Sequence, residues 1–248
     1  MVNVLAIIPT YNESENISEL LSRLDKVRKV LSSSYKIDIL IVDDNSPDKT
    51  IEIAKSSQLH NLSILSRAKK SGLGPAYLAG FDIGLQGDYQ YFVQMDADLS
   101  HMPEQLEILL SAASSENIVI GTRWMPGGSV INWPFHRRFI SRLGTKYASV
   151  VLNLNYKDLT SGYRVLPIRL LKALDLTGIK TKGYGFQIEI ACRARDSGFE
   201  IMQVPITFIE REKGRSKMDA KIVWEAWFKV SIWGFKRMLV ADNPHYVK

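Results

Sequence analysis

Cysteine is almost missing from this sequence, since the 248 residues include a single one, Cys192. One cysteine cannot form a disulfide within the chain, so a disulfide framework is excluded and a reducing compartment is expected. Long hydrophobic runs are missing too, because no stretch approaches the roughly 18 consecutive apolar residues of a membrane-spanning helix. The first residues enter a strand pattern without the charged and apolar regions of a secretory signal, so we expect no signal peptide.

Two common phosphate-binding loops are also absent. No Gly-x-Gly-x-x-Gly follows the first predicted strand and no Walker loop occurs, which disfavours dinucleotide and P-loop chemistry. The formal net charge is a moderate +6, and no basic stripe with spaced aromatic residues lies in the first half of the chain. We therefore expect no nucleic-acid partner. Such a charge fits acidic small molecules or an anionic membrane surface.

The composition is typical of a globular protein, with 46% hydrophobic and 23% charged residues. This length suits one large α/β domain, or one domain with a short appendage, and a chain of this size buries roughly three quarters of its unfolded surface. Short apolar runs predict strands at residues 3–8, 37–42, 62–65, 91–95 and 118–120. They alternate with helical patterns, which predicts a Rossmann-like α/β fold: a mostly parallel sheet with helices on both faces.

The helical patterns cover about residues 14–30, 75–85 and 139–152. In the first of these, apolar residues recur at i, i+3, i+4 and i+7, which predicts a stripe that faces the core. We expect the apolar face of the helix at 139–152 to be buried as well. Residues 125–133 hold a proline and two glycines beside tryptophans, which predicts a mobile loop that closes over a site. An ordinary surface loop is the alternative.

Carboxylates follow two of the predicted strands directly. Asp43 and Asp44 end the run at 37–42, and Asp96 and Asp98 follow the run at 91–95. The carboxyl ends of parallel strands meet at the edge where open α/β sheets bind ligands. Two carboxylates this close repel each other unless a cation lies nearby, and carboxylate oxygens are ligands that Mg²⁺ favours. The alternative for each cluster alone is helix capping, which does not explain paired acids after two strands.

Several segments together resemble a known family. They are residues 9–13 (PTYNE), 42–48 (VDDNSPD), 70–74 (KSGLG), 96–101 (DADLSH), 121–123 (GTR), 132–142 (NWPFHRRFISR), 158–164 (DLTSGYR), 183–187 (GYGFQ) and 208–217. In this order, over about residues 3–235, they resemble the inverting nucleotide-sugar glycosyltransferases of the GT-A fold. Within that group the chain is similar to the dolichol-phosphate (polyprenol-phosphate) mannose synthases.

The resemblance implies roles for particular residues. Nucleotide-sugar binding is implied for Pro9, Tyr11, Glu13, Val42, Asp44 and Lys70. Metal binding is implied for Asp96 and Asp98, catalysis for these two with Arg123 and Arg211, and acceptor-phosphate binding for Arg123, Arg137 and Ser141. The chemistry agrees, because a tyrosine can flank a base, carboxylates accept from ribose hydroxyls, and guanidinium groups bind phosphate bidentately. For Tyr11 and Glu13 the alternative is a turn at the entry to a helix, and for Lys70 it is a solvated basic loop. For each arginine the alternative is a surface charge.

One position departs from the family. Ser100 stands where the family usually has a glutamine near the metal. A shorter ligand, a water molecule or a different geometry must serve there in this chain.

The C-terminal region is predicted to be a separate element. Residues 218–240 form an amphipathic pattern of tryptophans and lysines, which predicts a helix in the membrane interface, with packing on the core as the alternative. Residues 1–217 are then the catalytic GT-A domain and residues 241–248 a tail. We expect a cytoplasmic protein that is peripheral on the cytosolic face of a membrane. A small membrane-spanning subunit is a further partner that the resemblance allows.

The resemblance implies metal-dependent, inverting transfer of mannose from GDP-mannose to a polyprenyl (dolichyl-type) phosphate, with Mg²⁺ or Mn²⁺ as cofactor and a β-linked product. Such an acceptor is already an anionic nucleophile near neutral pH, because the second pKa of a phosphate monoester is about 6. It needs positioning more than a general base. The alternatives are a transferase that uses a UDP-sugar (glucose or an aminosugar) and a non-catalytic nucleotide-binding subunit.

Overall fold

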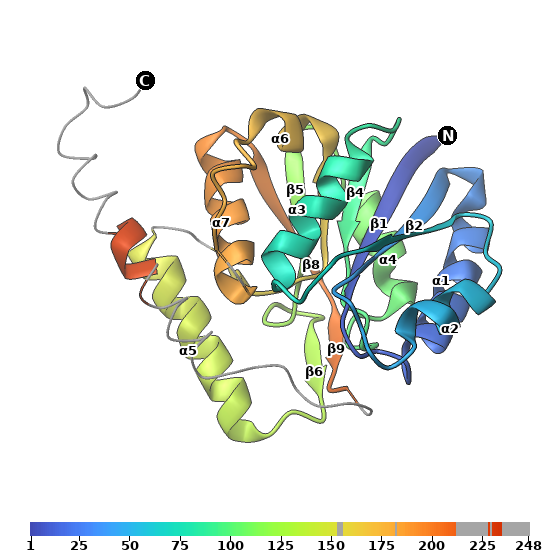
Figure 1. The fold of residues 1–248 in the computed structure, drawn as a ribbon. Coiled ribbons are helices and arrows are strands. Elements are labelled where there is room, and N and C mark those ends of the chain that lie inside the picture. The colour runs from blue at the N-terminus through green and yellow to red at the C-terminus, as the bar shows by residue number, and fades with distance from the viewer. Residues whose placement is uncertain (153–155, 182, 212–227, 229, 235–248) are drawn as a thin grey trace.

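The computed structural model describes residues 1–152, 156–181, 183–211, 228 and 230–234. Its strands are β1 (Val2–Thr10), β2 (Tyr35–Asp43), β3 (Leu62–Ser66), β4 (Tyr91–Gln94), β5 (Asn117–Thr122), β6 (Ser129–Ile131), β7 (Arg164–Pro167), β8 (Glu200–Pro205) and β9 (Thr207–Ile209). Its helices are α1 (Ile17–Val30), α2 (Thr50–Ser56), α3 (Leu73–Gly84), α4 (Leu106–Ser111), α5 (Phe135–Val151), α6 (Ile168–Ala173) and α7 (Gly183–Asp196). Figure 1 shows how these elements are arranged.

The main sheet has the strand order β3-β2-β1-β4-β7-β5-β8, and β6 pairs with β9 in a second, small sheet. β1 pairs in parallel with both β2 and β4, and β2 pairs in parallel with β3. β7 is antiparallel to β4 and β5, and β8 returns parallel to β5. The prediction of a mostly parallel α/β sheet is confirmed, with β7 as its reversed strand.

Helices cover both faces of the sheet (Figure 1), as predicted. One core layer packs α3, α6 and α7 on the sheet, with Tyr77, Phe81 and Phe186 among its fully buried side chains. The other packs α1, α2 and α4 on the opposite face, and the predicted stripe of α1 lies in it. The alternation of side chains along the central strands supplies both layers, so β1, the second half of β2 and β5 are largely apolar, as expected for a covered parallel sheet.

The loop predicted at residues 125–133 contains a strand. β6 pairs in parallel with β9, and Ser129 Oγ donates to Thr207 Oγ1 across the pair at 3.0 Å. The expectation of a simple loop is therefore wrong at its second half. The pairing partner lies 78 residues away in the sequence, so no local pattern could reveal it.

The expectation that the apolar face of residues 139–152 is buried is only partly right. Ala148 and Leu152 are buried, but large apolar side chains of α5 are exposed to solvent. They are Phe135 at 82%, Phe139 at 54%, Ile140 at 50%, Leu143 at 44% and Val150 at 72% exposed. We call these five side chains the α5 apolar face.

The helix predicted at 218–240 lies mostly outside the described residues. Residues 230–234 are helical and lie beside α5 (Figure 1). The side chains of Tyr147 and Ser231 join the two segments through a 2.6 Å hydrogen bond between Oη and Oγ. Val230 is buried in the core, whereas Phe228 is 69% exposed. Among the described residues, no helix is both long and apolar enough to cross a membrane.

Candidate active site

The first three strands of the parallel half end at one edge of the sheet. The register places Thr10 of β1 beside Asp43 of β2, and Ile7 of β1 beside Gln94 of β4. The Thr10 hydroxyl donates to the buried Asp43 carboxylate at 2.7 Å. Asp43 therefore fixes the two strand ends together, while the acids that follow β4 reach the same edge, as the sequence predicted.

Asp96 and Asp98 follow β4 in a tight turn. The Ser100 amide donates to Asp98 Oδ1 at 3.1 Å, and Leu99 between them has a φ of +62°. Asp98 Oδ2 lies 2.6 Å from Arg211 Nη2, so this carboxylate and the guanidinium form an ion pair. Ser100 is buried and serves this turn through its main chain.

Asp96 is the more accessible of the two acids, with a third of its side chain exposed. Even so, burial of the rest of the group, together with the nearby charge of Asp98, raises the pKa of the Asp96 carboxyl above its usual value. A bound cation would favour the charged form and reverse this shift. Two repelling carboxylates at an accessible edge therefore fit a divalent cation.

These two acids do not form a complete metal cage. Within the residues that the structure describes, no group of three or more acidic, histidine or cysteine side chains is close enough to hold a metal ion. Mg²⁺ typically binds through one or two carboxylates, with waters and substrate phosphates as its other ligands. The pair therefore fits a metal that arrives with a diphosphate better than a metal held by the protein alone.

His101 contacts Asp96 of this pair and was not among the predicted site residues. Its Nδ1 accepts a hydrogen bond from the Asp96 amide at 3.1 Å, and its ring stacks on Tyr163. Burial lowers the pKa of His101, so the imidazole is neutral near pH 7. It holds the main chain of Asp96 in place. The sequence signal that could have identified His101 is its position three residues after Asp98.

The predicted nucleotide residues lie at the ends of β1 and β2 and in the loop between β3 and α3. Lys70 Nζ lies 4.1 Å from the centre of the Tyr11 ring, so these two predicted residues meet as a cation–π pair. Asp44 accepts from Arg67 Nη1 at 2.8 Å and from the Ser71 amide at 2.9 Å, which holds the basic loop against the strand end.

Three further predicted positions are less open. Glu13 is buried and accepts from Asn16 Nδ2 at 2.9 Å, at the entry to α1. Pro9 is half-buried at the end of β1. The Val42 side chain is fully buried in the core, so only its main chain can reach a nucleotide. Its assignment stays a prediction in that restricted form.

Arg123 is buried, and neighbouring acidic, hydroxyl and aromatic side chains contact its guanidinium group. It makes a bidentate ion pair with Asp158, at 2.6 Å from Nε and 2.8 Å from Nη2, and also donates to Thr160 Oγ1 at 3.0 Å. Its guanidinium lies 5.2 Å from the rings of both Trp133 and Phe208. The alternative of a simple surface charge is excluded for this arginine.

Arg137 and Ser141 lie one turn apart near the start of α5. Arg137 is paired with Glu210 and lies 4.3 Å from the centre of the Trp133 ring. Ser141 is half-buried. The three arginines predicted to be in the site are therefore each paired with a carboxylate: Arg123 with Asp158, Arg137 with Glu210 and Arg211 with Asp98.

A chain of ring contacts joins the metal side to the arginine side. His101 Nδ1 lies 3.7 Å from Asp96 Oδ2, and the His101 ring meets Phe208 edge to face at 5.5 Å. Phe208 in turn contacts the guanidinium of Arg123 and the ring of Trp133. The predicted metal ligands and acceptor arginines therefore share one neighbourhood, with the nucleotide residues along the same sheet edge.

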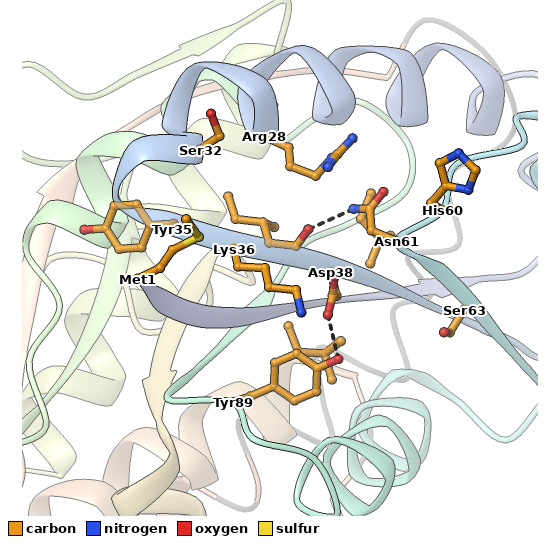
Figure 2. Close-up of a pocket in the computed structure, with 13 residues that line it drawn as sticks. Met1, Arg28, Ser32, Tyr35, Lys36, Asp38, His60, Asn61, Ser63 and Tyr89 are labelled. Atoms are coloured by element: carbon orange, nitrogen blue, oxygen red, sulfur yellow. Dashed lines mark hydrogen bonds between the residues drawn. The ribbon is translucent and has the colours of Figure 1, made fainter.

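The structure also contains a cavity of about 540 Å³ elsewhere, shown in Figure 2. It is lined by residues at the starts of β1 and β2, among them Met1, Tyr35 and Lys36. Tyr89 Oη donates to Asp38 at 3.0 Å at its wall. This cavity lies at the opposite ends of the strands from Asp96, and none of the predicted site residues lines it. It is not the site described above.

Comparison with known proteins gives consistent results. The family model for glycosyl transferase family 2 matches residues 5–175. The undecaprenyl-phosphate mannosyltransferase of Micrococcus luteus is 46% identical over 235 residues, which cover 94% of each chain. The polyprenol monophosphomannose synthase of Mycolicibacterium smegmatis is 43% identical, over 95% of this chain and 88% of that one. The dolichol-phosphate mannosyltransferase of Pyrococcus furiosus is 36% identical over 90% of this chain and 61% of its own length.

Among solved structures, the glucosyl-3-phosphoglycerate synthase of Mycobacterium tuberculosis superimposes with a TM-score of 0.67. The match covers 95% of this chain and 80% of that one, at 16% identity. The same enzyme has been crystallised with Mn²⁺, UDP and glucosyl-3-phosphoglycerate. At this identity the likeness supports the GT-A fold and nothing finer.

Proposed function

The chain belongs to glycosyl transferase family 2, and from this premise we propose that it transfers mannose from GDP-mannose to a polyprenyl phosphate. That it is a glycosyltransferase follows from the family and from relatives named as mannosyltransferases at 36% and 46% identity. The donor nucleotide, the metal and the membrane location are parts of the proposal. The acceptor class rests on the names of the relatives, which include undecaprenyl, polyprenol and dolichol phosphates.

The observation that carries the proposal is the shared neighbourhood of the paired acids and the arginines. Asp98 lies 2.6 Å from Arg211, and Asp96 is joined through His101 and Phe208 to Arg123. A transferase between two phosphate compounds needs a cation site and phosphate-binding cations side by side. Helix capping by the acids would require neither arginine.

On the donor side, the chain's residues bind and orient the nucleotide sugar. Tyr11 and Lys70, already in contact, can flank the base and the phosphates, and Asp44 offers carboxylate oxygens at the same strand ends. Arg211 forms an ion pair with Asp98. When a diphosphate binds, the guanidinium can donate to its oxygens instead, because a planar fork recognises carboxylate and phosphate alike.

Asp96 and Asp98 would hold Mg²⁺ or Mn²⁺ together with the donor diphosphate. When bound, the metal offsets the negative charge that develops on the leaving nucleoside diphosphate. The carboxylates hold it at the sheet edge, and His101 fixes the main chain of one of them. Ser100, where the family usually has glutamine, is buried and tied to the turn, so the remaining coordination falls to phosphate oxygens and water.

On the acceptor side, the arginines hold an anion that needs no deprotonation. The guanidinium of Arg137, on α5, lies 4.3 Å from the centre of the Trp133 ring and that of Arg123 lies 5.2 Å from it, so both groups contact the same aromatic side chain. They compensate the acceptor charge and orient its oxygen for in-line attack on the anomeric carbon, which gives an inverted, β-linked product. His101 is buried, neutral and already accepts a hydrogen bond, so it is not the base.

The α5 apolar face explains how a lipid could reach these arginines. Phe135 and Phe139 flank Arg137 in the sequence and are more than half exposed. Apolar side chains on the outer face of a helix can enter the interface of a membrane, which would bring a lipid phosphate to the helix start. We therefore propose a peripheral protein on the cytosolic face. Residues 1–217 as the catalytic domain, the helix at 218–240 and a small membrane-spanning partner subunit remain predictions.

A transfer assay tests the proposal directly. The purified protein is incubated with polyprenyl phosphate and with GDP-mannose, UDP-glucose or a UDP-aminosugar, with Mn²⁺, with Mg²⁺ or with a chelator. We expect lipid-linked mannose from GDP-mannose only, and none with the chelator. Transfer from a UDP-sugar instead would assign the donor to the alternative class. Absence of transfer from every donor would favour the non-catalytic subunit.

A further inference from the structure

A cluster of buried amide and hydroxyl groups lies beside the paired acids. In the described part of the chain, neither carboxamide atom of Gln94 or Gln187 has a hydrogen-bond partner, and the same holds for Ser161 Oγ. These side chains are at most 2% exposed. A buried polar group without a partner is costly, so native proteins rarely keep several together without a role.

Gln187 faces the metal side of the site. A β-carbon added to Gly162 would lie 3.5 Å from Asp96 Oδ1, 3.4 Å from His101 Cε1 and 3.7 Å from Gln187 Nε2. The carboxylate of a proposed metal ligand and the amide nitrogen of Gln187 therefore border the same small space. Because residue 162 is a glycine, it places no side chain between these groups.

The main chain around Gln187 is rigidly held. Arg164 is fully buried in β7, and its guanidinium donates to three main-chain carbonyls: Gln187 O at 2.6 Å, Ser161 O at 2.7 Å and Leu159 O at 2.7 Å. One side chain thus ties the first turns of α7 to the loop that contains Gly162. The unpartnered amide is presented on a fixed frame rather than on a mobile loop.

We propose that Gln187 binds hydroxyl groups of the donor hexose in the space above Gly162 and so takes part in sugar selection. A carboxamide offers one acceptor and two donor hydrogens, and a sugar hydroxyl both donates and accepts. The proposal rests on the proposed function, because the sugar is brought there by its diphosphate at Asp96 and Asp98. Gln187 is neutral, so it adds no repulsion toward the phosphate groups of either substrate.

Buried water is the competing occupant, and the two predict different results. Water that only satisfies the amide would make Gln187 a structural residue, and its loss would alter stability. If the amide instead serves to bind the sugar, it forms these hydrogen bonds only when the sugar is bound. An isosteric apolar residue would then leave the free enzyme as stable or more so, while transfer suffers.

The test compares the wild type with Gln187→Met, and with Gln86→Met in the exposed turn after α3 as a matched control. We expect kcat/KM for the nucleotide sugar to fall about 10- to 100-fold in Gln187→Met, as for the loss of one or two hydrogen bonds in a site. Its melting temperature and its affinity for GDP alone should stay at the wild-type values. Gln86→Met should match the wild type throughout.

Deoxy-mannose donors identify the contact. With the wild type, removal of the hydroxyl that Gln187 binds should lower kcat/KM, whereas Gln187→Met should not distinguish that donor from the parent sugar. An unchanged kcat/KM in Gln187→Met, an equal loss of GDP affinity, a lower melting temperature or equal losses for every deoxy donor would each overturn the proposal.

Gly162→Ala decides the matter if Gln187→Met does not fold. Its added methyl group would meet its neighbours at ordinary contact distances of 3.4–3.7 Å, so the fold should tolerate it. We expect weaker use of the nucleotide sugar with unchanged GDP affinity, and full activity would overturn the proposal. If the wild type transfers a sugar other than mannose, the proposed function fails. The same variants are then compared with that sugar, so the two failures are distinguishable.

Discussion

Replacement of Arg164 by methionine should destabilise the protein strongly. This arginine has no exposed surface, and its guanidinium donates to the carbonyls of Leu159, Ser161 and Gln187. Hydrogen bonds from a charged donor contribute about 1.5–3 kcal/mol each, so three of them contribute roughly 5–9 kcal/mol. Methionine fills much of the same volume but leaves the three carbonyls buried without a donor.

The cost of keeping a cation there offsets part of this stabilisation. Burial lowers the pKa of Arg164 to about 9, which corresponds to roughly 5 kcal/mol against the charged form. The group stays protonated at neutral pH all the same. The hydrogen bonds offset this cost with up to about 4 kcal/mol to spare, and the variant also leaves three buried carbonyls without a donor. We therefore expect Arg164→Met to lower the free energy of unfolding by about 2–4 kcal/mol.

Urea unfolding at pH 7, followed by circular dichroism, measures this change. Arg169→Met is the matched control, because Arg169 is exposed and pairs with an exposed Glu116 on the surface. Such surface pairs contribute about 0–1 kcal/mol, so the control should stay close to the wild type. An Arg164→Met protein as stable as that control would show that the three carbonyls do not depend on the guanidinium, and the reasoning would be refuted.

Three other changes test separate parts of the structure. Gly80→Ala should cost about 1–3 kcal/mol in urea unfolding, because its methyl group would lie 2.6 Å from Ile7 Cγ2; equal or greater stability would show that α3 can shift freely. The double change Phe135→Ser and Phe139→Ser should lower binding to anionic liposomes several-fold at an unchanged melting temperature; undiminished binding would exclude the α5 apolar face from the membrane contact. Arg137→Ala should raise KM for polyprenyl phosphate about tenfold while GDP affinity stays the same; the reverse pattern would assign Arg137 to the donor side.

The parallel half of the fold was predictable because its strands are short apolar runs that end in polar clusters. The runs at 37–42 and 62–65 fall within β2 and β3, and the acids at 96 and 98 lie at the predicted edge. β7 was missed for a physical reason. It begins with the buried Arg164 and ends at Pro167, so it does not read as an apolar strand, and its antiparallel place between β4 and β5 is set by distant partners.

The site was predictable in its residue types but not in its pairings. Asp158, which holds Arg123, lies 35 residues away, and Glu210, which holds Arg137, lies 73 residues away. No periodic pattern reports contacts of that range. Gln187 lies in a segment that resembles the family. Its proposed role in sugar binding rests on two amide atoms without a hydrogen-bond partner and on a neighbouring glycine, and these can be seen only in the structure.

Exposure on α5 could not be predicted either. A helical apolar stripe has the same pattern whether it packs on a core or on a membrane, so the sequence favoured burial. In the structure, Ala148 and Leu152 face the core, while Phe135, Phe139 and Val150 remain exposed.

Calorimetric titration of GDP into the protein, with Mn²⁺ and with a chelator, tests most directly whether Asp98 joins a metal to the nucleotide. The comparison uses the wild type, Asp98→Asn and, as control, Asp82→Asn on the exposed surface of α3. We predict that Mn²⁺ strengthens GDP binding tenfold or more in the wild type and in Asp82→Asn, and that Asp98→Asn loses this gain at an unchanged melting temperature. An Asp98→Asn protein that keeps the full Mn²⁺ dependence would contradict a metal site at this edge of the sheet.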